Sequence, residues 1–131
     1  MWEARFKTPF LLLKNMELIA LLSSGKGTWT EVSRIIEQGD WEKIILIGDE
    51  FSRKFTPKKQ FEFVQVNLRN DIISLRDEIS SKLKGKIDGL EVALSISSGI
   101  GIEHSALISA ILNIPLGIRL VSLSDEKLVE L

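Results

Sequence analysis

Residues 90–123 read LEVALSISSGIGIEHSALISAILNIPLGIRLVSL, and they contain a strand, a loop, a helix and a second strand in that order. The apolar run over residues 91–96 predicts a buried β-strand, because short apolar runs bounded by turn residues are typical of one. Small residues then turn the chain, and residues 104–112 predict a helix that is apolar over most of its surface. Turn-forming residues end that helix, and residues 118–123 predict the next strand. This is a building unit of an open α/β sheet.

The same alternation precedes this stretch. Residues 17–22, 43–47 and 61–67 predict three further strands, each apolar and followed by glycine or polar residues. Thr28, with Glu31 three residues later, forms a capping box, which predicts that a helix begins there. A second helix is predicted by apolar residues that recur every three or four positions: Leu68, Ile72, Leu75, Ile79 and Leu83.

Strands that alternate with helices predict right-handed crossovers and a mainly parallel sheet covered on both faces. We therefore expect a Rossmann-like, three-layer α/β/α domain in which the strands at 17–22 and 91–96 are neighbours. Residues 1–131 are expected to form one domain, with residues 1–15 as a possible added strand at the sheet edge. Residues 124–131 fit either a short helix or a strand returning along the previous one, and we favour the resulting β-hairpin.

The composition excludes several kinds of site. The chain has no cysteine and one histidine, so thiolate chemistry is absent, a zinc cluster is improbable and no cofactor is expected. A net charge of -1 argues against a protein that coats duplex DNA. The apolar run at residues 9–13 is far too short to cross a membrane or to serve as a secretory signal. We therefore expect a cytoplasmic protein that does not bind membranes.

Two loops of small residues are the candidate ligand site. The first consists of Ser23, Ser24, Gly25, Lys26, Gly27 and Thr28, and the second of Ser97, Ser98, Gly99, Ile100 and Gly101. Each follows a predicted strand and precedes a predicted helix, where unpaired amides and the helix dipole favour an anion such as phosphate. The spacing matches neither a Walker A loop nor a dinucleotide fingerprint, and ordinary glycine-containing turns are the alternative. If the two strands are neighbours, both loops flank one crevice.

Side chains near these loops allow more than one interpretation. His104 is a candidate general acid-base or base-stacking residue, although a lone histidine more often has a purely structural role. Glu103 disfavours a phosphate beside it but complements the helix dipole. The basic residues after the second strand, Arg53, Lys54, Lys58 and Lys59, are interpreted as a solvated loop in preference to a ligand site.

The arrangement resembles the CARF domains, the Rossmann-like sensor domains of CRISPR systems. The resemblance rests on the loop and Thr-x-x-Glu helix start within residues 18–31, on the Ser-Ser-Gly-Ile-Gly loop at residues 97–101, and on the closing strands at 118–131. The second loop differs from the Gly-Gly-Thr-Lys sequence common in that family. The resemblance implies a homodimer that binds a cyclic oligoadenylate, or another anionic nucleotide, on the two loops across its two-fold axis.

Three functions follow from this resemblance and remain open at the level of sequence. The first is a nucleotide-sensing regulatory domain in antiviral defence that we expect to act through a separate effector protein. The second is a ring nuclease that opens the cyclic oligoadenylate, with a ribose 2'-hydroxyl as nucleophile and Lys26 or a serine stabilising the phosphate. The third is a non-catalytic scaffold subunit. We prefer the first, because no nucleophile-and-base pair is evident.

Overall fold

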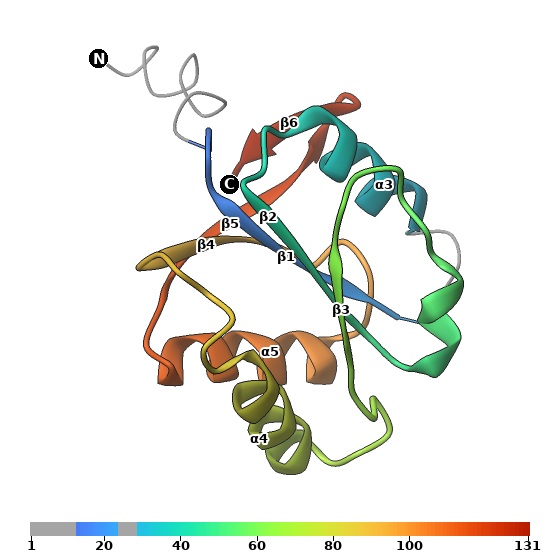
Figure 1. Cartoon of the computed structure of the whole chain (residues 1–131). Coiled ribbons are helices and arrows are strands. Elements are labelled where there is room, and N and C mark those ends of the chain that lie inside the picture. Colours follow the sequence, from blue (N-terminus) through green and yellow to red (C-terminus); the bar gives the residue numbers. More distant parts are fainter. Residues whose placement is uncertain (1–12, 24–28) are drawn as a thin grey trace.

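The computed structural model describes residues 13–23 and 29–131, whose strands form one six-stranded sheet (Figure 1). The strand order is β3-β2-β1-β4-β5-β6, and all neighbouring pairs are parallel except the antiparallel hairpin of β5 and β6. The bounds are β1 Glu17–Leu22, β2 Lys43–Gly48, β3 Glu62–Gln65, β4 Glu91–Ser95, β5 Gly117–Ser124 and β6 Lys127–Glu130. The predicted Rossmann-like α/β fold with a closing hairpin is confirmed.

Helices cover both faces of the sheet (Figure 1). α4 (Ile72–Leu83) and α5 (Gly101–Asn113) pack side by side on one face, and α3 (Trp29–Gln38) lies on the other. A short 3-10 helix, η2 (Glu50–Lys54), follows β2. Side chains alternate along the central strands, so each face of β1 contributes to a separate apolar core. The sheet is thus buried on both sides, as expected for parallel strands.

Two helices begin at positions that differ from the sequence prediction. α5 begins at Gly101 rather than at residue 104, because the Glu103 carboxylate accepts the Ile100 amide and so closes the first turn earlier. α4 begins at Ile72, where the Asp71 side chain accepts the Ser74 amide. Leu68 therefore lies before the helix, and Ile72 is 42% exposed rather than part of the buried stripe. The β3 strand is also shorter than the predicted 61–67.

The start of the chain departs from the predicted edge strand where it is described. Residues 13–15 form a turn, and Leu13 is buried in the core on the α3 side of the sheet. The remainder of that predicted strand lies outside the described residues. Within the described part of the chain the two edges of the sheet are β3 and β6.

Candidate functional site

The two predicted loops begin side by side. β1 and β4 are parallel neighbours, and the Ser23 amide, directly after β1, donates a 2.9 Å hydrogen bond to the Ser98 hydroxyl in the loop after β4. The chain moves outward from β1 to β2 and β3 and then returns to β4 on the other side. This reversal of strand order is where open α/β sheets bind ligands. Of the first loop, Ser24, Gly25, Lys26, Gly27 and Thr28 lie outside the described residues.

The second loop has a fixed conformation. Ser98 is fully buried, and Gly99 adopts a φ of 103°, a left-handed backbone conformation that glycine tolerates best. A Cβ at Gly99 would approach Leu21 Cδ2 to 2.6 Å and Glu103 Oε1 to 2.8 Å. His104 Nε2 lies 2.9 Å from the Ser98 carbonyl oxygen, so this half-buried histidine supports the loop.

Glu103 lies between Ser23, which follows β1, and Ile100, in the loop after β4. It is only 7% exposed, and its Oε1 accepts the Ile100 amide at 3.0 Å. Its Oε2 lies 3.5 Å from the Ser23 hydroxyl, at the outer limit of a hydrogen bond. No lysine, arginine or histidine within residues 13–23 and 29–131 forms an ion pair with it. A buried carboxylate therefore lies beside the carboxyl ends of β1 and β4.

The amino terminus of α5 is open beside this carboxylate. Its N-cap residue is Ile100, whose side chain has no acceptor, so no described side chain caps the first amides of the helix. Gly101 is exposed, and a Cβ added there would meet no atom within 4 Å. The last residue of the predicted loop is therefore the first residue of the helix, and no side chain in the described part of the chain caps its amide.

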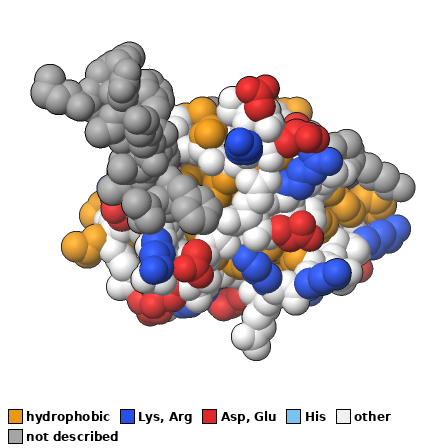
Figure 2. Space-filling view, turned by 90° about the horizontal axis from the view of Figure 1, so that it is seen from above, with side chains coloured by type: hydrophobic (Ala, Val, Ile, Leu, Met, Phe, Trp, Pro, Cys, Tyr) orange, Lys and Arg blue, Asp and Glu red, His pale blue; other side chains and the backbone are white. Residues whose placement is uncertain are grey.

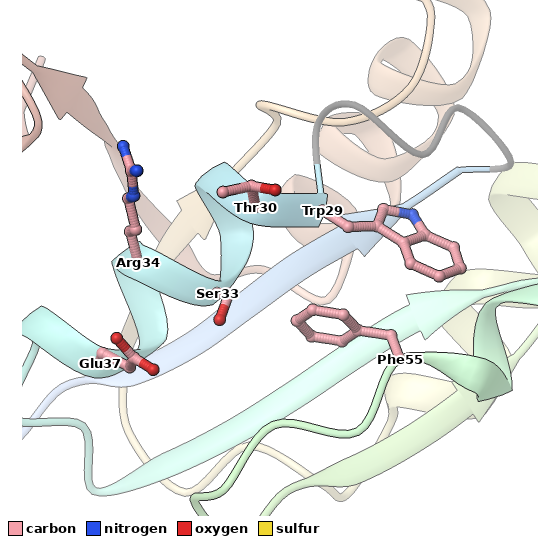
Figure 3. Close-up of a pocket in the computed structure, with 6 residues that line it drawn as sticks. All are labelled: Trp29, Thr30, Ser33, Arg34, Glu37 and Phe55. Atoms are coloured by element: carbon pink, nitrogen blue, oxygen red, sulfur yellow. The ribbon is translucent and has the colours of Figure 1, made fainter.

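Trp29 connects the first loop to an aromatic cluster that the sequence analysis missed. Its indole N–H donates to the Ser23 carbonyl at 2.7 Å, and its ring lies 5.7 Å from Phe51 and 5.8 Å from Phe55. A shallow pocket of about 370 Å³ opens beside it, with Trp29 and Phe55 at one end and Arg34 and Glu37 at the other (Figure 3). The only sequence signal was an aromatic residue immediately after the candidate loop.

The basic residues after β2 have mainly structural contacts. Lys59 Nζ donates to carbonyl groups at the carboxyl end of α3, including Ile36 and Gly39 at 2.8 Å. Arg53 stacks over Phe63, and Lys54 lies over Phe51. Lys58 is exposed. Three of the four basic residues therefore have structural contacts and are not only solvated.

The surface carries charges of both signs. On the face seen in Figure 2, lysine, arginine, aspartate and glutamate side chains are interspersed rather than gathered in one basic area. In the described part of the chain, no group of histidine and acidic side chains has the arrangement of a metal site. None of the described helices is both long and apolar enough to cross a bilayer.

Comparisons with known proteins identify no family for this chain. No known protein family and no curated protein matches the sequence. Among solved structures, the chain is similar to the C-terminal domain of a hydrogenase from Pyrococcus furiosus, with 11% identity and a TM-score of 0.43. The match covers 82% of this chain and 90% of that domain. A likeness at this level does not indicate a function.

Proposed function

We propose that this domain is a nucleotide-sensing regulatory module of CRISPR antiviral defence. It binds a cyclic oligoadenylate on the loops after β1 and β4, as a homodimer, and acts on a separate effector protein. The ligand class comes from the resemblance to CARF domains in the two loops. The position of the ligand rests on the geometry of the β1 and β4 ends.

The observation that carries the proposal is the hydrogen bond between Ser23 and Ser98 at the point where the strand order reverses. It joins two loops that are 75 residues apart in sequence, and each loop precedes a helix. The amino terminus of α5 lacks a side-chain cap, so its first amides have capacity for a ligand phosphate. Backbone amides and hydroxyl groups then provide most of the binding contacts.

The homodimer is supported by apolar side chains exposed at the same end of the domain. α4 and α5 both begin at the carboxyl end of the sheet, because each connects parallel strands in the same direction. Ile72 and Ile73 on α4, and Ile100 and Ile102 at the start of α5, are 42 to 61% exposed. Exposed isoleucines next to a ligand site suit a contact that a second copy buries.

The test is incubation with cyclic tri-, tetra- and hexa-adenylate, read out by thermal shift, light scattering and chromatography of the products. A regulatory module raises the melting temperature with one ring size, is dimeric at about 10 μM, and returns the ring intact. Absence of any thermal shift with all three rings contradicts the proposal. A linear product instead identifies the ring nuclease, and His104→Ala then tests whether the imidazole contributes to the rate.

Two variants test the position of the ligand. Gly101→Val adds bulk where a Cβ meets no atom within 4 Å, so binding is expected to fall sharply while the melting temperature of the free protein is unchanged. Lys26→Ala is expected to cost about 1 to 2 kcal/mol of binding free energy, with a smaller loss at high salt. If neither variant alters binding, the ligand does not occupy these loops.

A scaffold without a ligand is the second candidate, and the buried Glu103 carboxylate favours it. A carboxylate between two loops repels a phosphate that approaches closely, unless the ligand presents a hydrogen-bond donor at that point. A scaffold binds none of the three rings and still forms its dimer.

A further inference from the structure

β6 lies at one edge of the sheet, and some of its backbone groups point away from its neighbour β5. The two strands are antiparallel, so alternate residues of β6 turn their N–H and C=O groups toward β5 and away from it. The Leu131 amide donates to the Leu120 carbonyl of β5 at 2.8 Å. Val129, two residues earlier, therefore also faces β5, and the amides of Leu128 and Glu130 face outward.

A side chain of α3 occupies part of this outward edge. α3 packs against β6 (Figure 1), and Gln38 is its last residue. The Gln38 Oε1 accepts the Leu128 amide at 2.7 Å, and its Nε2 donates to the Glu126 carbonyl at 2.7 Å. A carboxamide has an acceptor and a donor, as a peptide group has. Gln38 therefore forms the pair of hydrogen bonds that a strand added to this edge would form.

The turn before β6 is held by the same helix. Asp125 and Glu126 have φ values of 50° and 62°, which the two-residue turn of a hairpin requires and which these residues adopt less readily than glycine. Arg34, one helical turn before Gln38, pairs with the Glu126 carboxylate at 2.7 Å. α3 thus binds Glu126 through both its carboxylate and its backbone carbonyl, which keeps the start of β6 against Gln38.

The other edge of the described sheet, β3, has a comparable contact. The Val66 amide donates to the Gly48 carbonyl of β2, so Gln65, one residue earlier, faces away from β2. Lys82 Nζ of α4 donates to the Gln65 carbonyl at 2.6 Å. Helix side chains therefore occupy outward backbone groups at both described edges, and at β6 one side chain occupies a donor and an acceptor together.

We propose that Gln38 blocks strand addition at β6 by occupying the backbone groups on which a second copy of this chain would otherwise pair, β6 against β6. A second copy is the partner because it brings an identical edge, and two identical edges meet antiparallel about a two-fold axis. β6 contains no proline, a residue that protects many sheet edges. This inference is independent of the nucleotide ligand and of the isoleucine contact proposed above.

Gln38→Met is the test variant, because methionine matches glutamine in length and helix propensity but lacks the carboxamide donor and acceptor. Size-exclusion chromatography with light scattering compares it with the wild-type protein between about 10 and 200 μM, a range in which weak pairing is detected. At the highest concentration, the mass of Gln38→Met is expected to reach at least twice the wild-type mass. An unchanged mass overturns the proposal.

Two controls separate strand pairing from general adhesion. Glu37→Met places the same apolar side chain at the preceding, exposed position of α3 and is expected to keep the wild-type mass. Adding Glu130→Pro to Gln38→Met removes an outward amide that β5 does not use, and the wild-type mass is expected to return. A mass increase that Glu37→Met shares, or that the proline does not reduce, also overturns the proposal.

A further variant keeps the test decisive where circular dichroism shows that the proline variant does not fold. Gln38→Lys leaves a donor for the Glu126 carbonyl and places a charge at the edge, which opposes strand pairing. It is therefore expected to keep the wild-type mass. If Gln38→Lys associates as strongly as Gln38→Met, occupation of the edge is not what prevents association, and the proposal fails while the proposed function stands.

Discussion

Buried glutamates lie at both ends of the sheet, and their surroundings differ. Glu17, at the amino end of β1, is 4% exposed and accepts the amides of Asp88 and Gly89 at 3.1 and 2.8 Å. Lys43 Nζ is 3.7 Å from it and also binds Asp88, whose hydrogen bond raises the pKa of this lysine. Glu103, at the opposite end, is 7% exposed and has one close amide donor.

The difference separates a carboxylate that several donors hold from one with a single close donor. Glu17 joins β1 to the turn before β4, 71 residues away, and its oxygens have donors. Its charge is needed to hold that turn. Glu103 caps α5 with one oxygen, and its other oxygen has the longer contact to the Ser23 hydroxyl. If this comparison is correct, mutations at the two ends affect different properties of the protein.

The largest effect on stability is expected at Gly99, in the loop after β4. Gly99→Ala places a Cβ 2.6 Å from Leu21 Cδ2 at a φ of 103°, so we expect a loss of about 3 kcal/mol in the free energy of unfolding. Gly101→Ala, where the Cβ has open space, is the control and should be neutral or slightly stabilising. Urea unfolding measures the free energy of unfolding of both variants. Similar stability of the two variants shows that the loop is not held as tightly as described.

The next largest effect on stability is expected when each of the two buried glutamates is replaced by glutamine. Glu17→Gln is expected to cost about 1.5 kcal/mol, because a neutral amide accepts the Asp88 and Gly89 amides less strongly and faces Lys43 with a poorer partner. Glu103→Gln is expected to change stability by less than about 0.5 kcal/mol, since its amide oxygen still accepts the Ile100 amide. Urea unfolding of both variants at pH 7 makes the comparison. An equal cost for the two changes means that Glu103 is as structural as Glu17.

The amino-acid sequence predicts the fold far better than it predicts the site. Apolar periodicity and glycine positions were enough to predict β1, β2, β4, the closing hairpin and the adjacency of β1 and β4, because these depend on local patterns and on general rules of α/β topology. The first turn of α5 was predicted too late because its cap comes from Glu103, three residues inside the helix, and not from an N-cap side chain. A helix start without a polar N-cap residue gives no sequence signal.

The contacts that define the site are between residues distant in sequence. Glu103 was weighed as a residue unfavourable for phosphate, but its burial and its contact with Ser23, 80 residues away, depend on how β1 and β4 pair. Trp29 likewise reaches the Ser23 carbonyl only after the chain has turned into α3. These features follow from tertiary packing, which local propensity does not encode.

A smaller effect is expected for the serine that joins the loops. Ser98→Ala removes the only described side-chain acceptor of the Ser23 amide, so we expect a loss of about 1 kcal/mol, measured by urea unfolding. Ser97→Ala is the matched control one residue earlier. Its hydroxyl has no hydrogen bond in the described part of the chain, and the change should remain within about 0.5 kcal/mol. A larger loss for Ser97→Ala would contradict the assignment of Ser98 as the link.

The smallest effect is expected at Asp71, an exposed carboxylate that accepts a hydrogen bond from a backbone amide. Asp71 caps α4, and the hydrogen bonds from the Ser74 amide at 2.9 Å and the Ser74 hydroxyl at 3.2 Å lower its pKa. A carboxylate with a lowered pKa in the folded state contributes stability that is fully present above the pKa of the unfolded chain. That contribution is lost as the pH falls through the pKa of the folded state, in a window below about pH 4.

Asp71→Asn isolates this contribution, because asparagine is a comparable N-cap residue that does not titrate in that window. Urea unfolding of both proteins between pH 6 and pH 2 gives the difference between their free energies of unfolding. This difference is expected to be constant near pH 6 and to shift in favour of the variant as the pH falls below about 4. Because other carboxylates titrate equally in both proteins, the difference reports Asp71 alone. A constant difference over the whole range would show that solvent screens the cap completely, and that burial, as at Glu17, is needed before an amide contact to a carboxylate affects stability.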